Sequence, residues 1–213
     1  MIHGIINVYK EKGFTSHDVV AKLRGIVGQK KIGHTGTLDP DATGVLPVCL
    51  GKATKLCDLL TDKNKTYEAV LLLGKTTDTQ DITGEVLEEK STEALTEEKV
   101  REAIEGFIGD YEQIPPMYSA LKVNGKKLYE LAREGKVIER KARPVKILDI
   151  QILEIDLPKV RMEVSCSKGT YIRTLCHDIG EKLGCGGCME SLIRTRVSTF
   201  RIEVRKCWMK SKP

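Results

Sequence analysis

The 213-residue sequence has no long apolar segment and no export signal. A membrane-spanning helix needs about 20 consecutive apolar residues, and no apolar run approaches that length. The first seven residues have neither the basic region nor the long apolar region of a secretory signal peptide. Hydrophobic residues make up 40% and charged residues 31% of the chain, the balance of a soluble globular protein with a real core. We therefore expect a cytoplasmic protein.

The glycine-rich segment 31–44 lacks the glycine patterns of the P-loop and of dinucleotide-binding folds. It is too rich in Gly and Pro for a regular element, and long loops inside compact domains are usually functional. Its Asp39 lies between Leu38 and Pro40, which fix the direction of the carboxylate and favour a nucleophile or general base. The alternative is an ordinary Asp-Pro turn. His34, taken alone, is typical of a structural histidine.

The cysteine pattern does not indicate disulfides or a complete metal site. Seven cysteines are an odd number in a chain without an export signal, so we expect reduced thiols. Cys185 and Cys188 have the spacing of half a zinc site, but no second Cys/His pair with ligand spacing accompanies them. The alternative for this segment is a tight turn after a helix. We expect no metal.

The net charge is only +5, from 35 basic and 30 acidic residues, but the charges are segregated along the chain. Residues 121–146 contain nine Lys or Arg against three Glu, and residues 161–213 contain eleven against five acids. Residues 76–120 contain twelve acids and three bases. This segregation favours a polyanionic partner met on one side. The alternative to such a partner is an ordinary enzyme with two solvated faces.

The segment 165–174 leads from a predicted strand into a predicted helix. Lys168, Arg173 and the free N–H groups of the helix start are suited to phosphate. Tyr171 adds a stacking plane of the kind that readers of single-stranded RNA use. The alternative is a buried tyrosine beside a surface arginine.

Hydrophobic periodicity predicts the α+β class, and we expect a single domain because no linker or repeat divides the chain. The predicted helices cover residues 16–26, 52–60, 97–108, 126–133 and 170–183. The predicted strands cover residues 4–9, 45–50, 66–73, 144–155, 160–166 and 191–200. Because strands and helices do not alternate regularly, we expect a mainly antiparallel mixed sheet flanked by helices.

Several motifs occur in the order found in one family. Residues 33–46, which read GHTGTLDPDATGVL, resemble the catalytic motif of the bacterial TruB-type pseudouridine synthases, which convert uridine 55 in the T arm of tRNA. Further matches lie at residues 65–68, 77–81, 113–122, 168–173 and 192–196. The resemblance covers nearly the whole chain to about residue 203, and it implies the pseudouridine synthase catalytic fold.

The resemblance also implies roles for individual residues. Asp39 would be the catalytic nucleophile, and Tyr67 would stack on the flipped base and help handle the proton at C5. Arg173 would pair with Asp39 and keep it ionised. The residues implied to contact the substrate are Tyr67, His34, Tyr171, Leu192, Lys168 and Arg194.

The resemblance implies a catalytic domain at 1–203, with an RNA-binding insertion at 113–141 that closes over the RNA. Family members usually continue into a C-terminal PUA domain, and the short basic tail 204–213 is too short to form one, so we expect weaker tRNA binding. The isomerisation transfers no outside group and has no redox step, so no cofactor is expected. The expected partner is the T stem-loop of tRNA, bound by a monomer with no obligatory protein partner.

Three other functions are compatible with parts of this pattern. The same reaction on another RNA, or within a guide-RNA particle, is the nearest alternative, but residues 113–122 resemble the stand-alone bacterial enzymes. A non-catalytic tRNA-binding module has no need for the Asp39 carboxylate. A metal or redox protein built on the cysteines is the most distant alternative.

Overall fold

The computed structural model describes residues 1–123 and 125–202, and the chain forms two compact units. The first unit contains residues 1–68, 165–168 and, among the described residues, those from 192 onward. The second contains residues 69–164 and 169–191. The predicted tail at 204–213 lies outside the described residues, and the predicted catalytic domain at 1–203 stays a prediction.

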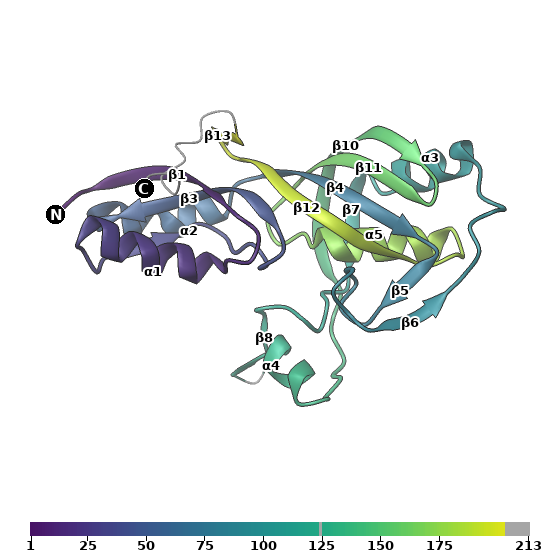
Figure 1. Cartoon of the computed structure of the whole chain (residues 1–213), viewed down its shortest axis with the longest axis horizontal. Helices are drawn as coiled ribbons and strands as arrows, with labels where there is room; N and C mark the ends of the chain where they lie inside the picture. Colours follow the sequence, from purple (N-terminus) through teal and green to yellow (C-terminus); the bar gives the residue numbers. More distant parts are fainter. Residues whose placement is uncertain (124, 203–213) are drawn as a thin grey trace, which may run out of the picture. The chain divides into compact units, whose positions relative to one another are not determined.

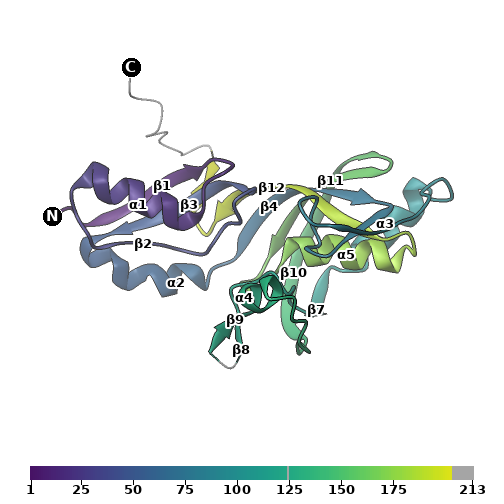
Figure 2. The ribbon, with the colours of Figure 1, turned by 60° about the horizontal axis from the view of Figure 1, so that its bottom comes forward.

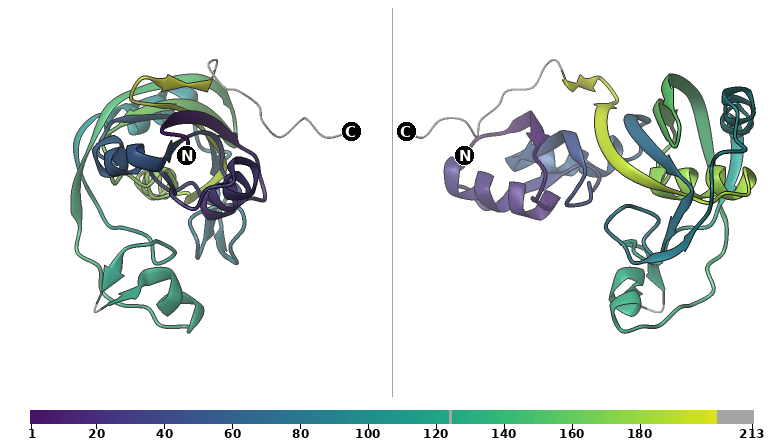
Figure 3. Two further views of the ribbon diagram at one scale, coloured as in Figure 1. Left: turned by 90° about the vertical axis from the view of Figure 1, so that its left-hand side faces the viewer. Right: turned by 45° about the vertical axis from the view of Figure 1, so that its right-hand side comes forward.

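The first unit is built on strand β3 (Thr43–Leu50). β1 (Gly4–Lys10) pairs antiparallel with β3 along its whole length, and β2 (Ile32–His34) pairs antiparallel with its C-terminal half. β12 (Gly187–Val197) pairs parallel with the start of β3, and β13 (Phe200–Arg201) turns back along the end of β12 (Figure 3).

Helix α1 (Ser16–Val27) runs alongside β1 and β3 (Figure 1) and covers the core of the first unit. Its N-terminus is a capping box, because Thr15 and Asp18 each accept a hydrogen bond from the other's backbone N–H. Gly28, at φ 67°, ends the helix in the left-handed conformation. The buried residues of this core are Val8, Val19, Val20, Leu23, Ile32, Leu46, Val48 and Leu50. The helix predicted at 16–26 is confirmed.

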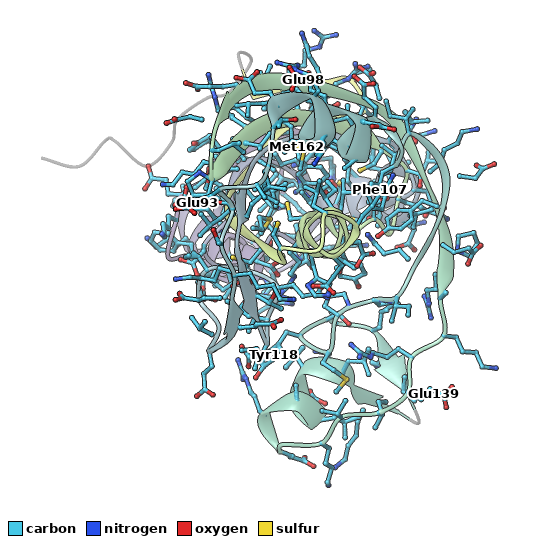
Figure 4. The ribbon with its side chains drawn as sticks, turned by 90° about the vertical axis from the view of Figure 1, so that its right-hand side faces the viewer. Glu93, Glu98, Phe107, Tyr118, Glu139 and Met162 are labelled. Atoms are coloured by element: carbon cyan, nitrogen blue, oxygen red, sulfur yellow. The ribbon has the colours of Figure 1, made fainter. Side chains whose placement is uncertain are left out.

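The sheet of the second unit has the strand order β12-β4-β11-β10-β7. Its further strands are β4 (Lys65–Leu73), β7 (Gly109–Gln113), β10 (Arg143–Asp156) and β11 (Lys159–Cys166). Helices α3 (Glu97–Glu105) and α5 (Ile172–Lys182) pack against each other. Met162 lies in the interior, whereas Glu93 and Glu98 lie at the surface (Figure 4).

Two smaller sheets complete the second unit. β5 (Lys75–Thr77) pairs with β6 (Val86–Glu89), and β8 (Lys122–Val123) pairs with β9 (Lys126–Lys127). β8, β9 and α4 (Leu128–Arg133) form the segment that projects from the rest of this unit (Figure 2). Tyr118 lies where the chain enters it (Figure 4).

The predicted α+β class with a mainly antiparallel sheet is confirmed, with local corrections. The helix predicted at 52–60 is a 3₁₀ turn, η1 (Gly51–Leu56), followed by the short α2 (Cys57–Thr61). The last predicted strand, 191–200, begins earlier as β12 and breaks at Ser198, whose φ is 53°. The predicted loop 31–44 contains β2, which forms through its pairing with β3 and has no local sequence signal of its own.

Among residues 1–123 and 125–202, no helix has the length and apolar character needed to cross a membrane.

Candidate active site

Asp39 lies in the first unit, on the loop that joins β2 to β3. Its side chain is half-buried, its neighbour Leu38 is buried, and its carbonyl accepts a hydrogen bond from Ala42 N at 3.1 Å. The aspartate therefore belongs to a tight turn, and its carboxylate is partly open to solvent.

Two buried polar side chains hold the backbone around Asp39. Lys10, at the end of β1, donates from Nζ to the carbonyl oxygens of Glu11 at 3.1 Å, Phe14 at 2.6 Å and Pro40 at 3.1 Å. Ser16 Oγ accepts from Leu38 N at 2.9 Å and donates to Leu38 O at 3.3 Å. The residues before and after Asp39 are thus both held by side chains from another part of the unit.

Lys10 is a functional candidate that sequence reasoning missed. Its side chain is fully buried, and burial lowers its pKa to about 8 against the opposing charges of Asp39 and Asp41. In the sequence it only ends an apolar strand, where most lysines are exposed, so no local signal distinguishes it.

Tyr67 and Arg194 meet beside the Asp39 loop. Tyr67, on β4, is buried, and its hydroxyl lies within hydrogen-bonding reach of the Arg194 guanidinium. Burial raises the pKa of Tyr67 to about 12, although the charge of Arg194 opposes the shift. The phenol is therefore protonated at neutral pH.

Lys65 is a second buried lysine that was not predicted as a site residue. Its Nζ donates to the carbonyl oxygens of Thr61 and Lys63, each at 2.8 Å. Burial, and then the nearby charge of Arg194, lowers its pKa to about 8. The first unit thus contains three buried cationic side chains, Lys10, Lys65 and Arg194, around one loop.

The other predicted substrate contacts in this unit differ in exposure. His34 is half-buried, and its ring meets that of His17 edge to face at 5.3 Å between centroids. Burial, followed by the charges of His17 and Arg194, lowers the pKa of His34, so this histidine is neutral at pH 7. Lys168 is exposed and pairs with Asp62 at 2.9 Å, and Leu192 on β12 is half-buried.

Arg173 and Tyr171 lie in the second unit, at the start of α5. Arg173 is buried, forms an ion pair with Asp81 at 3.3 Å and donates from Nη2 to Tyr118 O at 2.9 Å. Tyr171 is held by Gln113, whose side chain accepts from its N–H at 2.8 Å and donates to its carbonyl at 3.0 Å. The predicted pairing of Arg173 with Asp39 stays a prediction.

The structure therefore brings six of the eight predicted site residues into one unit. These six are His34, Asp39, Tyr67, Lys168, Leu192 and Arg194. The motif at residues 77–81 was recognised, but the role of its last residue, Asp81, as the partner of Arg173 was not predicted.

The cysteine-containing turn has no ligand arrangement around it. Gly184 at φ 78° and Gly186 at φ 75° form a turn directly after α5, so the tight-turn interpretation of the Cys185–Cys188 segment is confirmed. In the part of the chain that the structure describes, six cysteines are free thiols, and no group of three or more His, Cys, Asp or Glu side chains is arranged to hold a metal ion.

The fold is that of the pseudouridine synthases. The chain is similar to a chain of the crystal structure of a Cbf5-Nop10-Gar1 complex, with a TM-score of 0.73 and 36% identity over 93% of this chain and 50% of that one. It is also similar to a chain of an H/ACA RNP bound to a substrate RNA containing 2′-deoxyuridine, with a TM-score of 0.69 and 33% identity over 93% of this chain. This chain spans 48% of that second chain.

Within this class the chain belongs to the TruB family, whose members make pseudouridine at position 55 of tRNA. The model of the TruB family pseudouridylate synthase N-terminal domain matches residues 24–172, and that of the tRNA pseudouridylate synthase B C-terminal domain matches residues 173–209. The tRNA pseudouridine synthase B of Lachnoclostridium phytofermentans is 69% identical over 210 residues, 95% of this chain and 68% of the relative. That of Alkaliphilus oremlandii is 56% identical over 202 residues, 95% of this chain and 67% of the relative.

Proposed function

We propose that this chain converts uridine 55 in the T stem-loop of tRNA to pseudouridine, with Asp39 as its catalytic carboxylate. The observation that carries the assignment is the half-buried Asp39 on a loop whose backbone Lys10 and Ser16 hold on both sides. A structural Asp-Pro turn would not need two buried polar side chains to fix its neighbours. A carboxylate that reacts with a bound nucleotide does, because its direction must be set before the substrate arrives.

The chemistry that this site must support is an exchange of bonds on one ring. The N1–C1′ glycosidic bond breaks and a C5–C1′ bond forms, the proton at C5 is released, and N1 takes up a proton. The target base is first extruded from its stack at a cost of a few kcal/mol. Attack at C1′, attack at C6 and removal of a sugar proton all begin from an ionised Asp39.

The other predicted residues complete the proposed site. Tyr67 supplies an aromatic ring for the extruded base, and stacking of this kind contributes roughly 1–3 kcal/mol per base. Tyr171 and Leu192 would line the uracil pocket, His34 would hold the T loop, and Lys168 would face phosphate. Arg173 remains the proposed counter-ion of Asp39.

We also propose that the chain acts in the cytoplasm as a monomer without an obligatory protein partner. The insertion at 113–141, with β8, β9 and α4, supports a stand-alone enzyme rather than one that needs a guide-RNA particle, because this sequence resembles the bacterial stand-alone enzymes.

Tritium release from tRNA carrying [5-³H]uridine tests the assignment directly. We expect the wild type to release tritium and Asp39→Asn to release none, with the Kd for tRNA within about three-fold, because the substitution removes a nucleophile and no bulk. Asp41→Asn is the matched control: it changes an exposed aspartate of the same loop, which pairs only loosely with Lys12 at 3.5 Å. Release by Asp39→Asn at the wild-type rate would contradict the role of Asp39.

A further inference from the structure

Among the described residues, Arg194 is the largest of the fully buried side chains. It lies on β12 and donates from Nε to Val45 O at 2.8 Å, from Nη1 to Thr37 O at 3.4 Å and from Nη2 to Gly36 O at 3.1 Å. A guanidinium presents its donors in a rigid planar fork, so three such bonds fix the acceptors relative to one another.

These three carbonyl groups bracket the catalytic loop. Gly36 and Thr37 precede Asp39, and Val45 follows it as the loop enters β3. One side chain therefore ties the beginning of the loop to its end. Lys10 and Ser16 hold the residues next to Asp39, whereas Arg194 sets the separation of the two ends of the loop.

Gly44 allows the loop and Arg194 to approach each other closely. At Gly36 a Cβ would make only ordinary van der Waals contacts, 3.4 Å from Lys65 Cε and 3.6 Å from Arg194 Nη1. A Cβ on Gly44 would lie 2.2 Å from Arg194 O, so only glycine lets β3 pass the backbone of Arg194. The loop and the arginine are thus in contact through backbone as well as side chain.

Arg194 also contacts the aromatic residue of the proposed site. Its guanidinium lies within hydrogen-bonding reach of the Tyr67 hydroxyl. It therefore links the loop that carries Asp39 to the ring proposed to receive the base. The sequence predicts direct substrate contact for Arg194, but a fully buried guanidinium bonded to three loop carbonyls favours a different role.

We propose that Arg194 is a positioning residue, which fixes the Asp39 loop and the Tyr67 ring relative to each other and acts on the rate of isomerisation rather than on tRNA affinity. This inference rests on the proposed function of Asp39 and Tyr67. It goes beyond that function because it gives the fully buried Arg194 a role that needs no contact with the base or the phosphates.

The test compares Arg194→Lys with the wild type in three measurements. Lysine keeps the positive charge but loses the fork, so the three carbonyl groups lose their common partner. We expect the single-turnover rate of tritium release at saturating enzyme to fall about 100-fold, as a displacement of about 1 Å does. We expect the Kd for tRNA to stay within three-fold, and the amides of residues 36–45 to exchange faster with solvent.

Arg196→Met is the matched control, because Arg196 lies two residues further along β12 and is exposed. We expect it to keep the wild-type rate and the wild-type amide exchange at residues 36–45. A double-mutant cycle with Tyr67→Phe adds a readout that general destabilisation would not move. Arg194→Lys should slow the reaction less in the Tyr67→Phe background than in the wild type.

Weaker tRNA binding by Arg194→Lys at an unchanged rate would overturn the proposal in favour of direct RNA contact. Unchanged amide exchange at residues 36–45 would also overturn it. If Arg194→Lys does not fold, a second double-mutant cycle combines Tyr67→Phe with the loop variant Ser16→Ala. Additive effects of these two substitutions on the free energy of activation would overturn the coupling between the loop and the ring. A failure of the proposed function is distinguishable, because the wild type would then release no tritium while the amide exchange still reports on the loop.

Discussion

At the scale of single residues, the Asp39 loop is organised by side chains that are distant from it in sequence. Lys10 reaches the loop from 30 residues away and Arg194 from more than 150, as their hydrogen bonds to Pro40 and Gly36 show. The sequence identified Asp39 from its own neighbours and from a family motif. It did not identify Lys10, because the local sequence does not distinguish a buried lysine from an exposed one.

Lys10 makes the stability of the protein depend on pH in a defined direction. Its pKa in the folded chain is about 8, below the ordinary value of 10.5, so the unfolded chain binds the extra proton between these two pH values. Stability due to this group therefore rises with pH across that window, by up to about 1.4 kcal/mol per pH unit. Lys10→Met removes this contribution.

We expect the difference in free energy of unfolding between the wild type and Lys10→Met to grow from pH 8 to pH 10, measured by urea denaturation. Lys12→Met changes an exposed lysine of the same segment and serves as the control. A difference that stays constant between pH 8 and pH 10 would show that Lys10 is not desolvated in the folded protein.

At the scale of elements, the parallel contact between β3 and β12 is the junction that determines the site. Ile193 pairs with Thr43 and Arg194 with Gly44, so the short overlap of these strands brings Arg194 to the Asp39 loop. Gly44 has a φ of 113° and lies against the backbone of Arg194. A side chain at this position must separate the two strands.

Gly44→Ala is expected to lower the free energy of unfolding by about 3 kcal/mol, because it combines backbone strain with overpacking. Gly13→Ala is the matched control, since Gly13 also has a positive φ, 84°, but a Cβ there would meet no atom within 4 Å. We expect about 1 kcal/mol for Gly13→Ala from strain alone. Thermal or urea unfolding measures both losses. An equal loss of unfolding free energy for Gly44→Ala and Gly13→Ala would indicate that the close approach to Arg194 has no energetic cost.

Elements with a complete local signal were predicted well, and those that depend on a distant partner were not. Helix α1 has an apolar face, a capping box and a terminal glycine, all within residues 15–28. β2 is only three residues long and exists because β3 offers it hydrogen bonds in the register Ile32 to Leu50. The 3₁₀ turn η1 replaces the first part of a predicted helix for which the sequence offered no capping residue.

At the scale of the whole molecule, the segregated charge fits a polyanionic substrate. The insertion at 113–141 is rich in lysine and arginine, and Lys122 and Lys141 are exposed. The acidic segment at 76–120 contains exposed lysines as well, of which Lys99 is one. Position within this charge pattern, rather than charge alone, should decide which lysines meet the RNA.

We expect the dependence of tRNA binding on salt to weaken when insertion lysines are removed. For Lys122→Ala and Lys141→Ala, the slope of log Kobs against log salt should become less negative by about 0.7–0.9 per lysine that contacts a phosphate. Lys99→Ala should leave the slope at its wild-type value. An equal change for all three variants would mean that only the net charge of the chain matters.

The sequence by itself determined the class of fold and the family, and it singled out Asp39 as the proposed reacting residue. Helices, turns and motif residues are encoded in segments of a few residues, where capping, periodicity and glycine placement act locally. Only the tertiary structure decided which side chains surround Asp39. Lys10, Lys65 and Arg194 are buried around the loop. Lys10 and Arg194 donate hydrogen bonds to the loop backbone, and Lys65 donates to a neighbouring turn. Such contacts depend on strand pairings between residues that are distant in sequence, so local sequence patterns do not predict these contacts.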